Sequence, residues 1–114
     1  MQIDELLSTV TEKLDDGKGQ NIKIINVKEK SSVTDYMVIA TGTSERHVKA
    51  LAQQVSMDVK KKGLMPLGIE GESTGEWVLV DFGDLILHVM LGQTREHYQL
   101  EKLWETDIAV AANH

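Results

Sequence analysis

The sequence predicts an α/β fold, in which a single compact domain holds a mixed five-stranded sheet flanked by helices. Three observations support this prediction. A chain of 114 residues can build one real core, since at this length roughly 65% of the extended surface is buried on folding. Apolar residues recur at helical spacing in three segments. Short apolar runs bounded by glycine and polar turn residues lie between these segments, as strands do.

The first third of the chain predicts one helix and two strands. The apolar residues with helical spacing are Ile3, Leu6, Leu7, Val10 and Leu14. Asp16-Gly17 should end this helix. A strand is expected over residues 22–27, followed by a polar loop over residues 28–35. The run YMVIAT at residues 36–41 is almost continuously apolar, which is typical of a strand buried on both faces.

A long helix is predicted next. Thr43 or Ser44 should cap its N-terminus, and Gly63 should end it, with Pro66 following where a helix cannot resume. One face of this helix is apolar, through Val48, Leu51, Ala52, Val55 and Val59. A short strand is expected near Leu67. The strand at 36–41, the long helix and this short strand would form a right-handed crossover and hence a parallel pair.

The rest of the chain predicts a loop, a hairpin and a last helix. The loop GESTGE, residues 71–76, is rich in turn residues. After the hairpin, Thr94 should cap a helix over residues 95–105. The domain is therefore expected to span residues 1–105, with a flexible tail at 106–114.

The hairpin in EWVLVDFGDLILHVM, residues 76–90, can be predicted in register. Gly83-Asp84 suits a two-residue turn, in which glycine supplies the positive φ. One face is then wholly apolar and should be core: Val78, Val80, Phe82, Leu85, Leu87 and Val89. The other face is mixed: Trp77, Leu79, Asp81, Ile86, His88 and Met90. A helix could cover this mixed face or a partner could dock on it, and the pattern leaves both interpretations open.

Composition bounds the function. A net charge of −6 argues against direct binding to nucleic acid, where affinity comes largely from neutralising phosphates. The same charge suits a basic protein partner, although many soluble proteins are acidic without one. There is no cysteine, no run of about 18 apolar residues for a membrane span, and no signal-peptide pattern at the N-terminus. A cytoplasmic protein is therefore expected.

Three arrangements in the sequence are candidates for a catalytic site. TGTS at residues 41–44 follows a strand, as in nucleotidyltransferases, but Asp81 and Asp84 straddle a turn and should not share a metal ion. Ser44 and His47 could form a nucleophile and base, yet a cap explains Ser44 fully. The histidines lack metal-ligand spacing. No catalytic residue, metal or cofactor is predicted.

Three segments carry a family resemblance: TDYMVIATGTSERHVKALA (34–52), GIEGESTGEWVLVDFGDLILHVM (68–90) and REHYQLEKLW (95–104). Together they resemble the ribosomal silencing factor family RsfS, also called Iojap, over residues 4–105. The resemblance implies a minimal nucleotidyltransferase-like core without its catalytic pair. It also implies binding to the fourteenth protein of the large ribosomal subunit, so that subunit joining is blocked and translation is repressed when nutrients are limited.

The partner-binding residues that the resemblance implies lie mostly on the mixed hairpin face: Trp77, Asp81, His88, Met90, Arg95, Tyr98 and Glu70. Trp77 is the expected anchor, and the acids would meet basic groups of the ribosomal protein. An exposed face with Trp and Met also favours weak self-association into a homodimer. The alternatives are a small metal-dependent nucleotidyltransferase-like enzyme and an adaptor for another basic protein.

Overall fold

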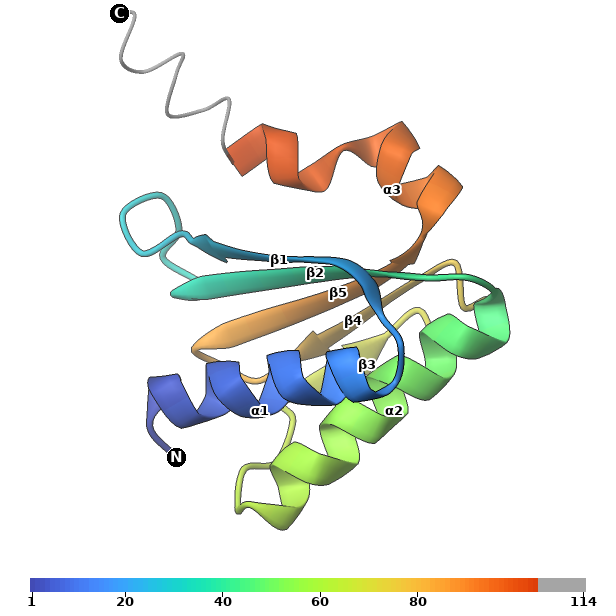
Figure 1. Cartoon of the computed structure of the whole chain (residues 1–114). Coiled ribbons are helices and arrows are strands. Elements are labelled where there is room, and N and C mark those ends of the chain that lie inside the picture. The colour runs from blue at the N-terminus through green and yellow to red at the C-terminus, as the bar shows by residue number, and fades with distance from the viewer. Residues whose placement is uncertain (105–114) are drawn as a thin grey trace, which may run out of the picture.

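A mixed sheet separates two helices on one face from a shorter helix on the other (Figure 1). The structure, a computed structural model, describes residues 1–104, and the predicted tail at 106–114 lies outside them. The elements are α1 (Ile3–Asp16), β1 (Gln20–Asn26), β2 (Tyr36–Gly42), α2 (Glu45–Lys61), β3 (Gly68–Glu70), β4 (Trp77–Asp81), β5 (Leu85–Leu91) and α3 (Gly92–Tyr98). This confirms the predicted fold class, a single α/β domain with a five-stranded mixed sheet.

The strand order is β1-β2-β5-β4-β3, and within residues 1–104 only β2 and β5 pair in parallel. The predicted parallel pairing of the strand near Leu67 with the strand at 36–41 is therefore wrong, since β3 lies at the far edge beside β4. Burial explains the difference. β5 is mostly buried on both faces and suits the centre of the sheet, whereas the three residues of β3 are mostly exposed and suit an edge.

The main core lies between the sheet and the two long helices. All five apolar residues predicted for the inner face of α2 are buried, as are the six predicted for the inner face of the hairpin. The predicted hairpin register is also confirmed, with Trp77 opposite Met90 and Asp81 opposite Ile86. Ser44 caps α2, because its Oγ accepts a hydrogen bond from the backbone N–H of His47 at 3.1 Å.

The last helix differs from its prediction. It begins at Gly92, directly after β5, and its N-cap is Leu91 with no side-chain cap, so Thr94 lies inside it. It also breaks at Gln99, where the backbone is left-handed (φ 49°), before residues 100–104 resume helical structure. β5 ends at Leu91 and the helix begins at the next residue. The backbone is therefore already helical when the chain reaches Thr94, the predicted cap.

The C-terminal segment covers part of the second sheet face. Trp77, Leu100 and Trp104 pack against a smaller core there, formed by Ile25, Val27, Met37, Ile39 and Met90. In Figure 1, α3 and the turn after it lie across this side of the sheet, opposite α1 and α2. None of the helices in residues 1–104 has the length and apolar character needed to cross a membrane.

Candidate functional site

Three aromatic side chains from three elements meet on the partly covered face of the sheet. The centroid of the Trp77 ring, on β4, lies 5.1 Å from the ring centroid of Tyr98, on α3. It lies 5.9 Å from the ring centroid of His88, on β5. His97 packs edge-on against Tyr98 at 4.9 Å. Tyr98 is 59% exposed and Trp77 is half-buried, so the cluster presents two large rings at the surface.

A hydrogen bond fixes the indole ring. Trp77 Nε1 donates to His88 Nδ1 at 3.0 Å. Because an indole can only donate, Nδ1 must be unprotonated and the imidazole carries its proton on Nε2. Burial lowers the pKa of His88 from 6.5 to about 4, since the charged form would lose its hydration. His88 is therefore neutral near pH 7, and this keeps the bond to Trp77 intact.

The register of the hairpin already implied this contact. Trp77 faces Met90 and Leu79 faces His88, so Trp77 and His88 are diagonal neighbours on one face of the hairpin. Diagonal pairs of this kind are within reach of aromatic side chains. Their bond was not predicted, although the pairing that permits it was.

Further residues of this sheet face extend the cluster toward β3. Register places Glu70 beside Leu79, and Gly68 beside Asp81. Glu70 is exposed, while Asp81 is half-buried and its Oδ1 accepts a 2.8 Å hydrogen bond from the backbone N–H of Gly83. We use "aromatic surface" for the half-buried or exposed residues of this region: Trp77, Leu79, Ile86, Tyr98, Glu70 and Asp81.

Two residues predicted for partner binding lie beneath this surface. Met90 is completely buried in the smaller core, and His88 is 6% exposed. As placed, both support the aromatic surface from below, and neither presents its side chain to a partner. Tyr98, by contrast, presents most of its side chain at the surface.

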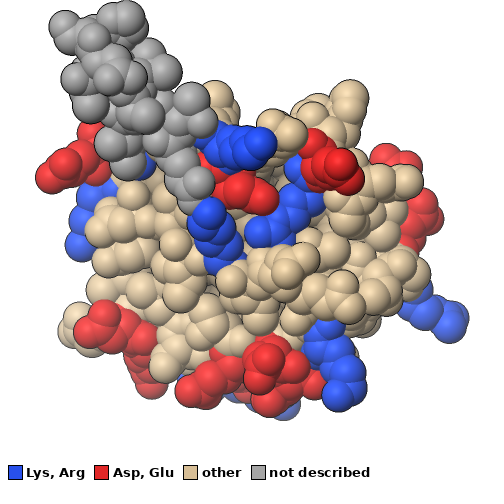
Figure 2. All heavy atoms as spheres, turned by 45° about the horizontal axis from the view of Figure 1, so that its top comes forward, with Lys and Arg blue, Asp and Glu red and all other residues tan. Residues whose placement is uncertain are grey.

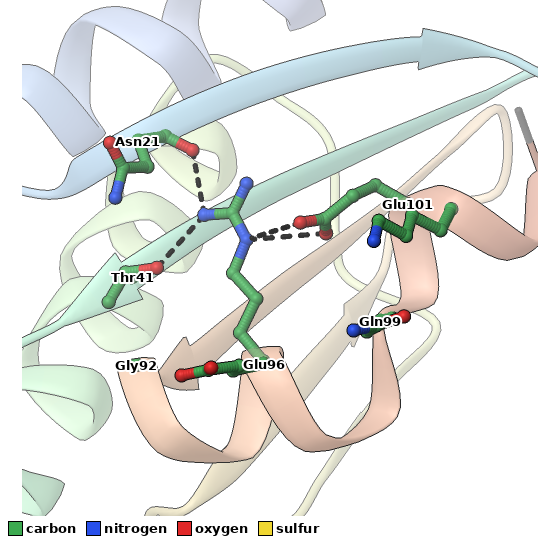
Figure 3. A pocket seen from close by; sticks show the side chains of 8 residues that line it. Asn21, Thr41, Gly92, Glu96, Gln99 and Glu101 are labelled. Carbon is green, nitrogen blue, oxygen red and sulfur yellow. Dashed lines mark hydrogen bonds and ion pairs between the residues drawn. The ribbon is translucent and has the colours of Figure 1, made fainter.

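Arg95 joins three parts of the chain at one end of the sheet. Its Nη1 donates to the backbone oxygen of Asn21 at 2.7 Å and to Thr41 Oγ1 at 2.9 Å, while Nε donates to Glu101 at 3.0 Å. Figure 3 marks these bonds in a polar pocket that Gln99 also lines. The guanidinium side chain is only 11% exposed, so Arg95 serves the chain itself and holds the segment that carries Tyr98.

Replacing Arg95 by alanine is expected to loosen this segment. The change removes the hydrogen bonds to Asn21, Thr41 and Glu101 and leaves the half-buried carboxylate of Glu101 without its cation, which should cost about 2 kcal/mol. In the variant, amide hydrogen exchange should become faster than in the unmutated chain over residues 92–104, while β5 should keep its protection. Arg46→Ala, which removes an exposed arginine from α2, is the matched control. Equal protection in both variants would contradict the proposed role of Arg95.

The residues of the candidate catalytic arrangements have structural partners. Besides the cap made by Ser44, the imidazole of His47 lies between the backbone N–H of Thr43, 2.9 Å from Nδ1, and the backbone oxygen of Gly17, 2.8 Å from Nε2. Asp84 belongs to the hairpin turn, where its backbone oxygen accepts from Tyr36 at 3.1 Å. Across residues 1–104, no three His, Asp or Glu side chains form a group that could hold a metal ion.

Charges of both signs are interspersed on the side of the molecule that carries α3. Figure 2 shows blue and red side chains next to one another around this helix, with uncharged surface between them. No broad basic patch is visible on this face, in keeping with the net charge of −6. This arrangement offers little to a phosphate backbone.

Comparisons with known proteins agree on one family. A family model described as "Ribosomal silencing factor during starvation" matches residues 1–113. The ribosomal silencing factor RsfS of Haemophilus influenzae is 46% identical over 99 residues, covering 87% of this chain and 97% of that protein. A mouse protein named "Mitochondrial assembly of ribosomal large subunit protein 1" is 37% identical over 90% of this chain and 44% of its own length. The crystal structure of a Chromobacterium violaceum protein superposes with a TM-score of 0.90 at 43% identity, covering 92% of this chain and 88% of that one.

Proposed function

The chain belongs to the family of ribosomal silencing factors, and we propose that it represses translation by binding the large ribosomal subunit and blocking its joining to the small subunit. The family description associates silencing with starvation, so the chain would act when nutrients are limited. The name of the mouse relative, which refers to assembly of the large subunit, supports the choice of subunit. The proposed partner within it is a basic protein, the fourteenth of the large subunit.

The observation that carries this proposal is the aromatic surface itself. A half-buried Trp77 and an exposed Tyr98 stand together at the margin of the face that α3 covers. Tryptophan and tyrosine are enriched among the residues that dominate binding energies, because each buries a large area at low entropic cost. His88 holds the indole in one orientation, so less freedom is lost on binding.

The acids of the aromatic surface favour a basic partner. Glu70 and Asp81 lie on β3 and β4, next to the aromatic pair on the same sheet face. Carboxylates at the rim of an interface speed encounter with lysine and arginine and set the register of docking. The same charges would repel ribosomal RNA, so protein contact and not RNA contact is the proposed basis of binding.

Silencing in this scheme needs no reaction. A domain placed where the small subunit must approach prevents joining by occupying space, and we propose no catalytic residue, metal or cofactor. The domain that docks would comprise residues 1–105. Arg95 contributes indirectly, because it fixes the segment that carries Tyr98.

Co-sedimentation with separated ribosomal subunits tests the proposal. The purified chain is run through a sucrose gradient with small subunits alone, large subunits alone, and a mixture of both at magnesium levels that allow joining. The expected result is migration with the large subunit only, and fewer joined ribosomes in the mixture. Migration with neither subunit, or an unchanged yield of joined ribosomes, would contradict the proposed function.

A further inference from the structure

A second apolar patch lies on the opposite face of the sheet from the aromatic surface. Within residues 1–104, four of the nine exposed large apolar side chains gather there, on the outer side of α2, the loop after it and β3: Met57, Met65, Leu67 and Ile69. Ile69 pairs with Val80, whose side chain is buried beneath the long helices, so the patch lies on the α2 side of the sheet. A groove of about 290 Å³, the α2–β3 groove, is lined by Ser56, Met57, Lys60, Met65, Pro66 and Ile69. Exposed apolar side chains gathered around a groove are typical of a protein-binding site.

The α2–β3 groove borders an open edge of the sheet. β3 is the last strand in the order, and no other strand in residues 1–104 lies beside its outer edge. The strand contains neither proline nor lysine, the residues that commonly protect an edge from pairing. A strand that pairs with such an edge gains main-chain hydrogen bonds, and its alternate side chains point toward the groove. The occupant that suits this geometry is therefore an extended segment.

The charge at the groove is positive. Lys60 is the only charged residue in its lining, and Lys61, which is also exposed, follows it. Neither lysine forms an ion pair within residues 1–104. Lys62 differs, since it lies 4.0 Å from Asp58 and donates a hydrogen bond to Thr9 on α1. Lys60 and Lys61 are thus available to the carboxylates of a partner.

The acids of this region lie away from these lysines. Glu70 stands beside Leu79 and faces the aromatic surface, and Glu72 lies beyond the end of β3. Lys60 lines the groove together with Met65, which precedes β3, so the lysines stand where the chain enters this strand. A segment that pairs antiparallel with β3 has its C-terminal end at that place. Acidic residues at the C-terminal end of the segment would meet the lysines.

We propose that the α2–β3 groove binds an extended, acidic segment of another protein. The segment pairs antiparallel with β3, places an apolar side chain between Met57 and Ile69, and brings its acidic C-terminal end to Lys60 and Lys61. Its chemistry is opposite to that of the basic ribosomal protein proposed for the aromatic surface. Because the two sites lie on opposite faces of the sheet, this proposal does not depend on the proposed ribosomal function.

Fluorescence anisotropy of a defined peptide tests the proposal. The probe is a fluorescein-labelled peptide in which valine alternates with threonine and two glutamates form an amidated C-terminal end. The matched peptide carries two lysines in place of the glutamates. Titration with the full chain up to about 1 mM should show saturable binding of the glutamate peptide and at least tenfold weaker binding of the lysine peptide.

Three results of this titration would overturn the proposal. They are the absence of saturable binding, equal binding of the two peptides, and anisotropy that falls again as the chain is concentrated. The last result would mean that a second copy of the chain displaces the peptide from the groove.

Charge reversal tests the role of the lysines. Lys60→Glu should weaken binding of the glutamate peptide by about tenfold, because repulsion replaces attraction at the acidic end. The same variant should bind the lysine peptide more tightly than the unmutated chain does. Lys102→Glu is the matched control, since it makes the same change in net charge at an exposed site in the segment after α3. An equal loss in both variants would show that only net charge matters, and would overturn the proposal.

A carboxylate in the groove tests the apolar contact. Met57→Asp should abolish binding of the glutamate peptide, and the fold should survive because Met57 is 59% exposed on the outer side of α2. Leu103→Asp makes the same kind of change at a 64% exposed site after α3 and should leave binding unchanged. Circular dichroism verifies that both variants fold. Full affinity in Met57→Asp would overturn the proposal. So would the loss of peptide binding in Trp77→Ala, because the peptide would then lie on the aromatic surface.

Discussion

Trp77→Ala is expected to weaken binding to the large ribosomal subunit by about thirtyfold or more, which corresponds to the roughly 2 kcal/mol typical of an interface hot spot. The indole is the largest ring of the aromatic surface, and His88 and Tyr98 hold it in place. The fold should survive, because Trp77 is half-buried and packs at the margin of the smaller core. Titration of the variant against large subunits in the co-sedimentation assay measures the effect.

Two further variants make this test specific. Trp77→Phe keeps an aromatic ring but loses the hydrogen bond to His88. Its affinity for the large subunit is therefore expected to lie between that of the wild type and that of the alanine variant. Met57→Ala truncates an exposed residue on the opposite side of the sheet and should bind normally. If Trp77→Ala instead abolishes cooperative unfolding, Trp77 belongs to the core and the assignment fails.

Acidification is expected to destabilise the fold through His88. Its pKa is near 4 in the folded chain and near 6.5 when unfolded, so the unfolded state binds more protons between these values. Stability is therefore complete above about pH 6.5 and falls as the pH drops toward 4. The expected contribution is about 2 kcal/mol between pH 7 and pH 4.5. Urea unfolding at both pH values measures the difference.

Carboxylates also titrate in this range, so variants must isolate the histidine. His88→Asn keeps an acceptor near the position of Nδ1 but cannot take up a proton, and should lose about 2 kcal/mol less on acidification than the wild type. His97→Gln, at an exposed position, should follow the wild type. Parallel pH dependence of wild type and His88→Asn would rule out His88 as the source.

Local patterns were enough to predict the hairpin, the long helix and most of the core. Alternation fixed both faces of the hairpin because Gly83-Asp84 allowed one register, and helical spacing identified the buried face of α2. These features depend on neighbours in the chain, where sequence patterns are most informative. The same register brought Trp77 to the mixed face, where the structure places its indole against His88 and Tyr98.

Other features depend on contacts between distant residues, which no local pattern contains. The sequence predicted the next strand after the helix as the parallel partner of β2. In the structure β5 takes that place, and it is the most deeply buried of the three strands that follow α2. The break at Gln99 and the bonds of Arg95 to Asn21 and Thr41 depend on how the last segment folds back over the sheet. Because no local pattern reveals these bonds, Arg95 was predicted as a docking residue. In the structure its N–H groups bind other residues of the same chain.

The central parallel ladder also governs how the chain can fold as it is made. Partners in the β2–β5 ladder stand 49 positions apart, as Tyr36 and Leu85 do. Such a contact can form only after the intervening chain has been synthesised, and only then can it offset the entropy that is lost when that chain is closed into a loop. The first two strands and the long helix must therefore wait, with one side of β2 unpaired, until β5 is complete at Leu91. Folding of this domain is thus a late event in its own translation, and its unfinished forms expose an apolar strand edge that chaperones would have to shield.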